Sequence, residues 1–485
     1  MAQPARYSEQ ARKIYPPAVQ RSGSLRSDFH AITGEETTRD QITNDVHRDR
    51  AAFGSSHMKI SRTTSRLNRT TFLWIADWLA VLVAVSLPWS TSATQIFGVA
   101  WLFSLLPALV PAMIRRELAS AAGGLPVLLW CLALIGTMWS DVSWSDRLQG
   151  LDSFHRLLVI PALLAQFRQS ENGHRVLFGF VISSVLLLIT SFILVLIPYL
   201  PWHGKVWGIP VHDDVLQGSI FLICAFALLG VARAAFSQRR WRAAVTSSAI
   251  AGLFLLNFAF VQISRTAVPV VLVLFCLLGW RIYRWRGIVF GLIGAIVLGG
   301  AFWFASSTVR ERAVSSMREI TNYRATNEST PLGQHIAYLK EGLAIIASAP
   351  IIGHGTGSMS AQFRKVTSGK SGVSGEATDN PHNQTFTVAI QLGFVGATLL
   401  WFMWIAHLLL FRGEGIIAWI GTVVVVENVV SSVFHSHLFD FGNGWLYIFG
   451  VGVLGGMILR EHDAGQGQQK REVITLTSDS VGQLS

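Results

Sequence analysis

The sequence predicts an all-α, polytopic integral membrane protein with about twelve transmembrane helices and one large polar loop. Apolar residues make up 51% of the 485 residues and charged residues only 14%, whereas about a quarter of a soluble domain is charged. Segments 71–305 and 384–459 are almost wholly apolar, and segment 306–383 between them is polar with mixed charges. A bundle of membrane helices that holds one large loop on one side of a bilayer accounts for this contrast.

Twelve segments are candidates for membrane spans, because a spanning helix needs roughly 20 apolar residues. With soft boundaries they are 71–89, 93–114, 124–140, 154–167, 176–199, 215–235, 243–263, 266–283, 288–305, 384–411, 416–436 and 444–459. The fourth and the twelfth are short. Segment 154–167 also fits a tilted or partly immersed helix.

The placement of basic residues predicts the orientation of the bundle. With residues 1–70 in the cytoplasm, thirteen basic residues fall in the inner connections, and four fall in the short outer ones: Arg147, Arg156, Lys205 and Arg265. This excess agrees with the positive-inside rule. An even number of spans then returns the C-terminus to the cytoplasm and places loop 306–383 outside, in the periplasm if the host is a Gram-negative bacterium. We therefore expect a multi-pass protein with both termini in the cytoplasm, in the inner membrane of such a host.

The membrane domain, residues 69–460, is expected to lie between two polar tails. Residues 1–68 are rich in Arg, Ser and Thr and lack the early apolar core of a signal peptide, which predicts a mostly disordered cytoplasmic tail. Residues 461–485 have a similar composition, and we expect the same of them.

The formal charge of +11 does not predict nucleic-acid binding, because much of it is arginine on the expected cytoplasmic face. The sequence has no zinc-finger spacing, RNP-type motif or P-loop pattern. The three cysteines, Cys131, Cys224 and Cys276, all fall inside predicted spans, so no disulfide is predicted.

One segment of the polar loop has clear helical character. Thr330 and Pro331 provide an N-cap and a proline at the first helical position. The apolar residues that then recur at helical spacing are Ile336, Leu339, Leu343 and Ile346, and Pro350 ends the run. Residues 353–357, Gly-His-Gly-Thr-Gly, predict a flexible turn, and the Gly/Ser/Thr-rich stretch 365–380 is expected to be mobile.

Three motifs follow one another along this part of the chain: Ser264-Arg265-Thr266 at a span boundary, "APIIGHGTGSM" after the loop helix, and "TDNPHNQTFTVAIQLGFVGA". In this order they resemble the bacterial O-antigen ligase and O-antigen polymerase superfamily over roughly residues 260–445. Pro-His-Asn followed by "IQLGFVG" is the most specific part. Ser-Arg-Thr alone would be weak.

The resemblance implies a membrane-embedded, GT-C-like glycosyltransferase that takes a glycan from undecaprenyl diphosphate on the periplasmic face. A ligase moves the glycan to a sugar hydroxyl of lipid A–core, and a polymerase moves it to another repeat unit. The family's ligases are regarded as inverting and metal-independent, so neither a metal nor another cofactor is expected.

Arg265 is the candidate that would bind the diphosphate. It lies at the outer end of the eighth predicted span, and a guanidinium group offers a planar fork of donors that suits phosphate oxygens. The alternative is an interfacial arginine that extends its charge to the lipid headgroups.

His382 is the candidate general base. With Asn380 as N-cap and Pro381 at the first helical position, we expect it in the first turn of the tenth span, where the helix dipole favours a neutral imidazole. A neutral imidazole accepts a proton from an attacking hydroxyl. The next residue, Asn383, is a candidate for substrate binding. The alternative for His382 is a capping or interfacial histidine.

The chain departs from the family at the start of the loop helix, where many members carry an arginine and this chain has Gln334-His335. If that arginine normally binds diphosphate, His335, Arg324 or Lys340 would be the substitute here. His435, His437 and Asp440 crowd the outer end of the eleventh span, but histidines two apart do not share a helix face, and no metal site is predicted.

Several functions remain open at this point. The leading one is an O-antigen ligase. A polymerase of O-antigen or exopolysaccharide has the same fold and donor, and a protein O-oligosaccharyltransferase differs only in its acceptor. A transporter without chemistry suits twelve spans, but no second half of the chain matches the first.

Overall fold

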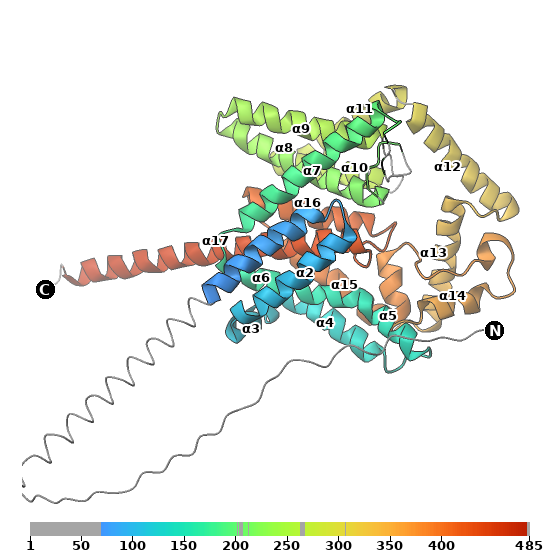
Figure 1. The fold of residues 1–485 in the computed structure, drawn as a ribbon, viewed down its shortest axis with the longest axis horizontal. Coiled ribbons are helices and arrows are strands. Elements are labelled where there is room, and N and C mark those ends of the chain that lie inside the picture. Colours follow the sequence, from blue (N-terminus) through green and yellow to red (C-terminus); the bar gives the residue numbers. More distant parts are fainter. Residues whose placement is uncertain are drawn as a thin grey trace, which may run out of the picture. The chain divides into compact units, whose positions relative to one another are not determined.

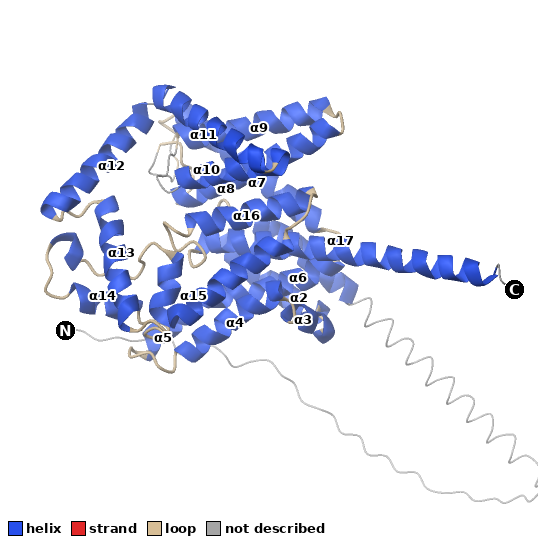
Figure 2. Ribbon diagram, turned by 180° about the vertical axis from the view of Figure 1, so that it is seen from behind, coloured by secondary structure: helices blue, strands red, loops and turns tan. Residues whose placement is uncertain are grey.

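The computed structural model describes residues 69–200, 202, 207–211, 213–261, 267–305 and 307–482, and no β-strand occurs among them (Figure 2). The predicted N-terminal tail 1–68 and Arg265 lie outside these ranges. The described part of the chain is therefore helical, as the composition predicts.

Figure 1 labels the helices in the order in which they follow one another along the chain. The first runs from Arg69 to Ser86. The others are α2 (Thr91–Leu105), η1 (Leu106–Ala108), α3 (Pro111–Leu118), α4 (Ala121–Gly136), α5 (Trp144–His155), η2 (Arg156–Leu158), α6 (Val159–Gln169), α7 (Gly173–Leu196), α8 (Asp214–Ser237), α9 (Trp241–Phe260), α10 (Ala267–Tyr283), α11 (Trp285–Ala305), α12 (Ser307–Thr326), α13 (Pro331–Ser348), α14 (Met359–Thr367), η3 (Gly372–Gly375), α15 (Gln384–Leu410), α16 (Ile416–Ser431) and α17 (Phe441–Gly482).

Seven helices within the described ranges are long and apolar enough to cross a membrane: Arg69–Ser86, Thr91–Ala108, Gly173–Leu196, Asp214–Ser237, Trp241–Phe260, Gln384–Leu410 and Phe441–Gln469. An eighth span results if α3 and α4, which meet at 84°, are counted as one. Three further apolar helices are shorter: Ala267–Tyr283, Trp285–Ala301 and Ile416–Ser431. The chain is thus a multi-pass helical protein, and the count of twelve is not confirmed.

The fourth predicted span does not form a helix of membrane-spanning length. Segment 154–167 forms η2 and the eleven-residue helix α6, whose residues from Ile160 to Phe167 are all buried. Helix α6 packs along α17, and two of its leucines, Leu163 and Leu164, contact glycines of α17. Its apolar sequence therefore reflects burial between other helices.

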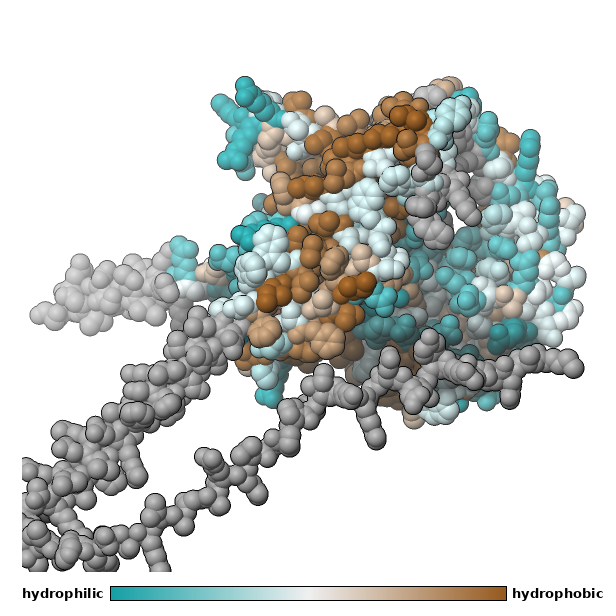
Figure 3. Space-filling model, viewed as in Figure 1, coloured by the Kyte–Doolittle hydropathy of each residue, from teal (hydrophilic) through white to brown (hydrophobic). Residues whose placement is uncertain are grey.

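Apolar side chains line both the interior and the outer surface of the bundle. Trp101, Phe154 and Trp404 are buried in the core. Large apolar side chains are also exposed, as shown by Phe103 at 70% and Phe178 at 69%. On the face drawn in Figure 3, hydrophobic residues gather over the long helices, and hydrophilic ones gather on the side where Figure 1 places α12–α14. Exposed apolar surface on this scale is typical of lipid-facing helices.

Segment 306–383 contains three helices, α12, α13 and α14, and the turn η3. The predicted cap of α13 is confirmed, since the hydroxyl of Thr330 accepts a hydrogen bond from the Gly333 amide and Pro331 begins the helix. The predicted apolar face is only partly buried: Leu339 and Leu343 are 40% and 60% exposed. Ile346 of that face is buried together with Tyr338 and Ile345, since α13 turns these residues toward α14 and α15.

The C-terminal stretch also differs from the expectation of a disordered tail. Helix α17 continues through residue 460 to Gly482 (Figure 1). Within it, the carboxylate of Asp463 accepts hydrogen bonds from Arg116 and Arg168, each at 2.8 Å. These ion pairs connect α17 to α3 and α6 and account for helical order just beyond the apolar segment.

The two most specific motifs of the sequence pair with each other at a break in α15. Gly393 interrupts the helix with a φ of +63°, a conformation that glycine adopts readily. The break leaves backbone amides and carbonyls on both sides without helical hydrogen-bond partners, and turn 350–355 supplies these partners. The amides of His354 and Gly355 donate to the carbonyls of residues 390 and 391, and the amides of residues 394 and 395 donate to those of Pro350 and Ile351. The turn predicted as flexible is therefore built into the bundle.

Candidate functional site: a histidine cluster beside a polar cavity

His382 lies in the connection just before α15, not in its first turn. The N-cap is Asn383, whose side chain accepts a hydrogen bond from the Phe386 amide, so the predicted cap at Asn380 is wrong. His382 has a φ of +53°, which is uncommon for a residue with a side chain. The Asn380 carboxamide oxygen accepts the His382 amide at 2.9 Å and supports this turn.

The side chain of Asn383 forms hydrogen bonds that hold the fold together. Besides capping α15, its side-chain amide donates to the carbonyl of Val433 at 3.0 Å. It is 9% exposed. These contacts fasten the start of α15 to the end of α16, so Asn383 holds the neighbouring His382 and His435 segments together.

Three imidazoles from three segments meet at this point. His335 is the fifth residue of α13, His382 lies in the connection before α15, and His435 lies in the connection after α16. The ring centroids lie 4.9 Å apart for His335 and His382, 5.6 Å for His382 and His435, and 6.1 Å for His335 and His435. The sequence brought His335 and His382 forward as separate candidates, and the fold brings them together.

Two more rings extend the cluster. The ring of Tyr338, one turn after His335 on α13, stacks on His382 at 6.3 Å. His437 lies 5.2 Å from His435 and is almost fully buried. We refer to His335, His382, His435 and His437 as the histidine cluster.

The cluster favours uncharged imidazoles. Burial, and secondarily the neighbouring His382, lowers the pKa of His335 to about 4. Burial, and secondarily His382 and His335, lowers the pKa of His435 to about 4. Burial, and secondarily His435, lowers the pKa of His437 to about 3. Burial also lowers the pKa of His382, and the nearby Asp379 carboxylate opposes this change. A neutral ring can accept a proton at pH 7.

The Nδ1 atom of His382 is buried and has no hydrogen-bond partner. One hydrogen-bonding position of this ring is therefore unused within the protein.

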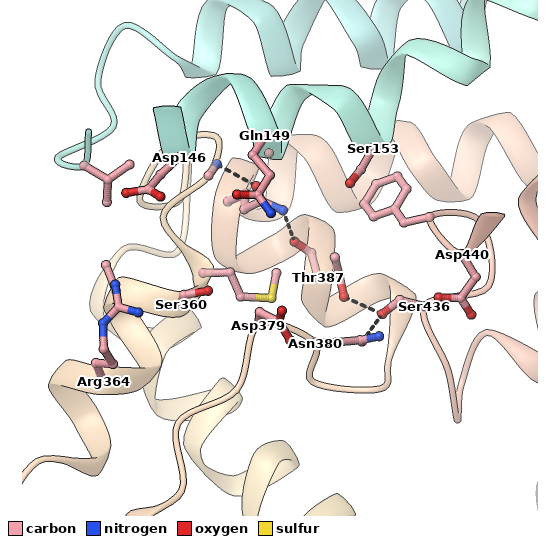
Figure 4. Close-up of a pocket in the computed structure, with 17 residues that line it drawn as sticks. Asp146, Gln149, Ser153, Ser360, Arg364, Asp379, Asn380, Thr387, Ser436 and Asp440 are labelled. Carbon is pink, nitrogen blue, oxygen red and sulfur yellow. Dashed lines mark hydrogen bonds between the residues drawn. The ribbon is translucent and has the colours of Figure 1, made fainter. Parts of the chain in front are cut away.

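A polar cavity of about 390 Å³ is lined by residues that are close to the cluster in sequence, although none of the four histidines lines it (Figure 4). Its wall includes Asn380, two residues before His382, and Ser436, between His435 and His437. On the opposite wall α5 contributes Asp146, Gln149 and Ser153, which Figure 4 shows across the cavity from Asn380 and Ser436.

A chain of hydrogen bonds holds the inner wall of the cavity. Ser436 donates to the Asn380 side chain and shares a hydrogen bond with Thr387, each at 2.8 Å. The side chain of Gln391 donates to the Thr387 carbonyl and accepts from the Gly357 amide. The wall is thus connected to the glycine turn and to the helix break at Gly393.

The cavity carries more negative than positive charge. Asp146, Asp379 and Asp440 line it together with one cation, Arg364. Burial and the nearby Asp213 raise the pKa of Asp440 to about 6, against the opposing effect of Arg156. The guanidinium of Arg156 donates to the backbone carbonyls of Asp440 and Phe439, at 2.7 and 3.1 Å, and so fixes this wall. Carboxylates, amides and hydroxyls around one phenyl ring match the hydroxyl-rich surface of a sugar.

The remaining predicted site residues are the cations proposed to bind diphosphate and the possible substitutes for them. Arg265 lies outside the described residues, so its diphosphate role stays a prediction. Arg324 and Lys340 are both exposed. Lys340 follows His335 by five positions, which turns it about 140° around α13 from that histidine. Of the three suggested substitutes for an arginine, only His335 is in the cluster.

Sequence reasoning gave no role to His435 or Tyr338. His435 was visible only as part of a His-x-His pair, which does not share one face of a helix. The structure places it in a connection beyond the end of α16, where that argument does not apply. Among the described residues, no group of three His, Cys, Asp or Glu side chains is arranged to hold a metal ion.

Comparison with known proteins is consistent with these features. Residues 250–402 match a family model described as O-Antigen ligase, a range that contains α13, the glycine turn, His382 and the break in α15. No match was found among curated proteins. The match supports a ligase- or polymerase-type function in a membrane setting with lipid-linked glycan substrates. It supports the resemblance noted in the sequence: over about a third of its length, this chain is similar to the O-antigen ligase family.

Proposed function

We propose that this protein is an O-antigen ligase-like glycosyltransferase that moves a glycan from undecaprenyl diphosphate to a hydroxyl of lipid A–core on the periplasmic face of the inner membrane. The observation that carries the proposal is the position of His382. Its ring belongs to a cluster of neutral imidazoles, and its backbone is held by Asn380, which also lines the polar cavity. In this proposal the imidazole of His382 accepts the proton, and the cavity beside Asn380 holds the acceptor sugar.

In the proposed reaction the acceptor hydroxyl occupies the polar cavity near the imidazole of His382. The hydroxyl oxygen attacks the anomeric carbon of the donor sugar from the side opposite the diphosphate. The bond from that carbon to the diphosphate oxygen breaks as the new glycosidic bond forms, and the configuration inverts. His382 takes the hydroxyl proton, and undecaprenyl diphosphate leaves as an anion.

The lowered pKa of His382 has a specific consequence for this step. The ring is unprotonated at pH 7 and so available as a base. The leaving diphosphate is already a stable anion and needs no general acid. One base is therefore sufficient, and the remaining requirement is a cation near the diphosphate, which we assign to Arg265.

A transfer assay tests the proposal. Purified full-length protein in lipid nanodiscs is incubated with labelled undecaprenyl diphosphate-linked glycan and lipid A–core. The expected product is labelled lipid A–core, and Arg265→Ala is expected to lose donor binding. Donor glycan that lengthens without reaching the core would instead establish a polymerase, and transfer to an added pilin-like protein would establish a protein O-oligosaccharyltransferase. Flux of lipid-linked glycan across the bilayer without any transfer would make the protein a transporter.

A further inference from the structure

A second cavity lies at the other ends of α15 and α16, away from the histidine cluster. Its volume is about 480 Å³. It is bounded by the C-terminal ends of α8, α10 and α15 and by the start of α16. Because α15 is 27 residues long, roughly 40 Å of helix separate this cavity from His382.

Four arginines from four separate segments line this cavity. Arg233 comes from α8, Arg281 from α10, Arg284 from the turn after α10, and Arg412 from the connection after α15. The one carboxylate among the lining residues is Glu414. The cavity therefore has an excess of three positive charges. We refer to it as the arginine cavity.

Within the part of the chain that the structure describes, none of these four arginines forms a salt bridge. Other arginines at the same end of the bundle do: Arg116, Arg168 and Arg460 pair with carboxylates. Like charges that converge without counter-ions repel one another, and a bound anion removes this cost.

Basic residues near helix C-termini also complement the helix dipole and mark one face of a membrane protein. That explanation accounts for the sign of the charge on each helix. It does not account for four guanidinium groups facing one space. Arg281 fixes one wall, since it donates to the backbone carbonyls of Gly413 and Gly415 and lies over the ring of Trp419.

The same cavity has an apolar side. Leu277, Trp280 and Leu408 line it beside the arginines, and Trp280 is 45% exposed. Tryptophan is enriched where membrane proteins meet lipid headgroups. A ligand that suits both sides carries a negatively charged phosphate next to hydrocarbon.

We propose that the arginine cavity binds a phosphate-bearing anion, and that the headgroup of an anionic phospholipid supplies it. Arginine pairs with phosphate oxygens through two parallel hydrogen bonds, and basic pockets between membrane helices bind anionic headgroups. The apolar side distinguishes a lipid from free phosphate, since only a lipid would use it. This proposal is independent of the glycan-transfer function.

Native mass spectrometry of the full-length protein tests the proposal. The protein is released from vesicles of phosphatidylcholine alone or of phosphatidylcholine with cardiolipin, and retained lipids are counted. The double variant Arg233→Gln/Arg412→Gln removes two charges that form no salt bridge within the described part of the chain. At about 1 kcal/mol per arginine, it is expected to bind the anionic lipid about thirtyfold more weakly.

The matched control is Arg240→Gln/Arg242→Gln, which removes two exposed charges from the neighbouring start of α9, outside the cavity. It is expected to retain the anionic lipid as the wild type does. Equal loss in both double variants, or undiminished binding in the cavity variant, would overturn the proposal. Inorganic phosphate is the second probe. If it displaces the lipid and stabilises the wild type but not the cavity variant, the arginine cavity binds an anion, and this anion is a soluble phosphate in place of a lipid headgroup.

Discussion

The imidazole rings of His335 and His382 lie 4.9 Å apart, although one belongs to α13 and the other to the connection before α15. A proton on either ring raises the cost of a proton on the other, and both rings are partly removed from water. Both rings therefore stay neutral below the pH at which a free imidazole titrates. This links the packing of the polar segment to the chemistry of His382.

Acid should destabilise the fold through these histidines. The pKa of His335 and of His435 falls from 6.5 to about 4 on folding, so the unfolded chain binds more protons between these values. Stability is then complete above pH 6.5 and is lost as the pH falls toward 4. His335→Gln should reduce this loss, measured as the change in melting temperature between pH 7 and 4.5. His174→Gln, which changes an exposed imidazole on α7, is the control, and equal slopes in the two variants would contradict the assignment.

Asp440 should govern acceptor binding. Its carboxylate lines the polar cavity, and its pKa is raised to about 6. Asp440→Asn removes a charged acceptor of hydrogen bonds and should raise the KM for lipid A–core about tenfold, with little change in donor affinity. In the wild type the same KM should rise as the pH falls through 6, and the variant should lose this dependence. Asp141→Asn, which changes an exposed carboxylate that does not line the cavity, should behave as the wild type.

Asn380 is a positioning residue, because it holds the backbone of His382 and accepts a hydrogen bond from Ser436. Asn380→Ala should lower kcat and leave donor binding unchanged. Asn380→Asp keeps both acceptor bonds and should restore much of the rate. Its added charge raises the pKa of His382, so the acid limb of the pH–rate profile should move to higher pH. A full rate in the alanine variant would exclude this role.

The glycine turn should be intolerant of a methyl group. Gly355 has a φ of +89°, and an added Cβ would lie 2.4 Å from the Cα of Ser140. Gly355→Ala should lower the free energy of unfolding by about 2–4 kcal/mol, from backbone strain and overpacking. Gly252→Ala is the matched control, because its Cβ meets open space on helix α9 and should stabilise the protein slightly. Denaturation in detergent measures both, and equal effects would argue against the packed turn.

Local signals in the sequence were enough to predict many of the helices. The cap at Thr330 and the long apolar segments follow from neighbouring residues alone, and the structure has them. Segment 154–167 was misassigned because burial between helices and burial in lipid select the same side chains. The face of α13 was partly misassigned because Gly342 and Ala337 allow close approach to α15, and small residues give no apolar signal.

The candidate site was only partly predictable for a related reason. His382 and His335 stand out by their motifs, but their contact depends on how α13 packs on α15. The N-cap was misplaced by three residues, because Asn380 and Asn383 both suit that position and only the turn at His382 decides between them. The role of the glycine turn depends on hydrogen bonds to a helix break that lies far along the chain.

The most direct test of the central claim is the single-turnover rate of glycan transfer by His382→Asn. Asparagine tolerates the positive φ of this position and cannot accept the proton. With saturating donor and acceptor, the rate should fall by about 10²–10⁴-fold, the usual contribution of a general base, while donor binding is retained. His174→Asn should keep the wild-type rate. A rate for His382→Asn within a factor of about two of the wild type would show that this imidazole is not the base.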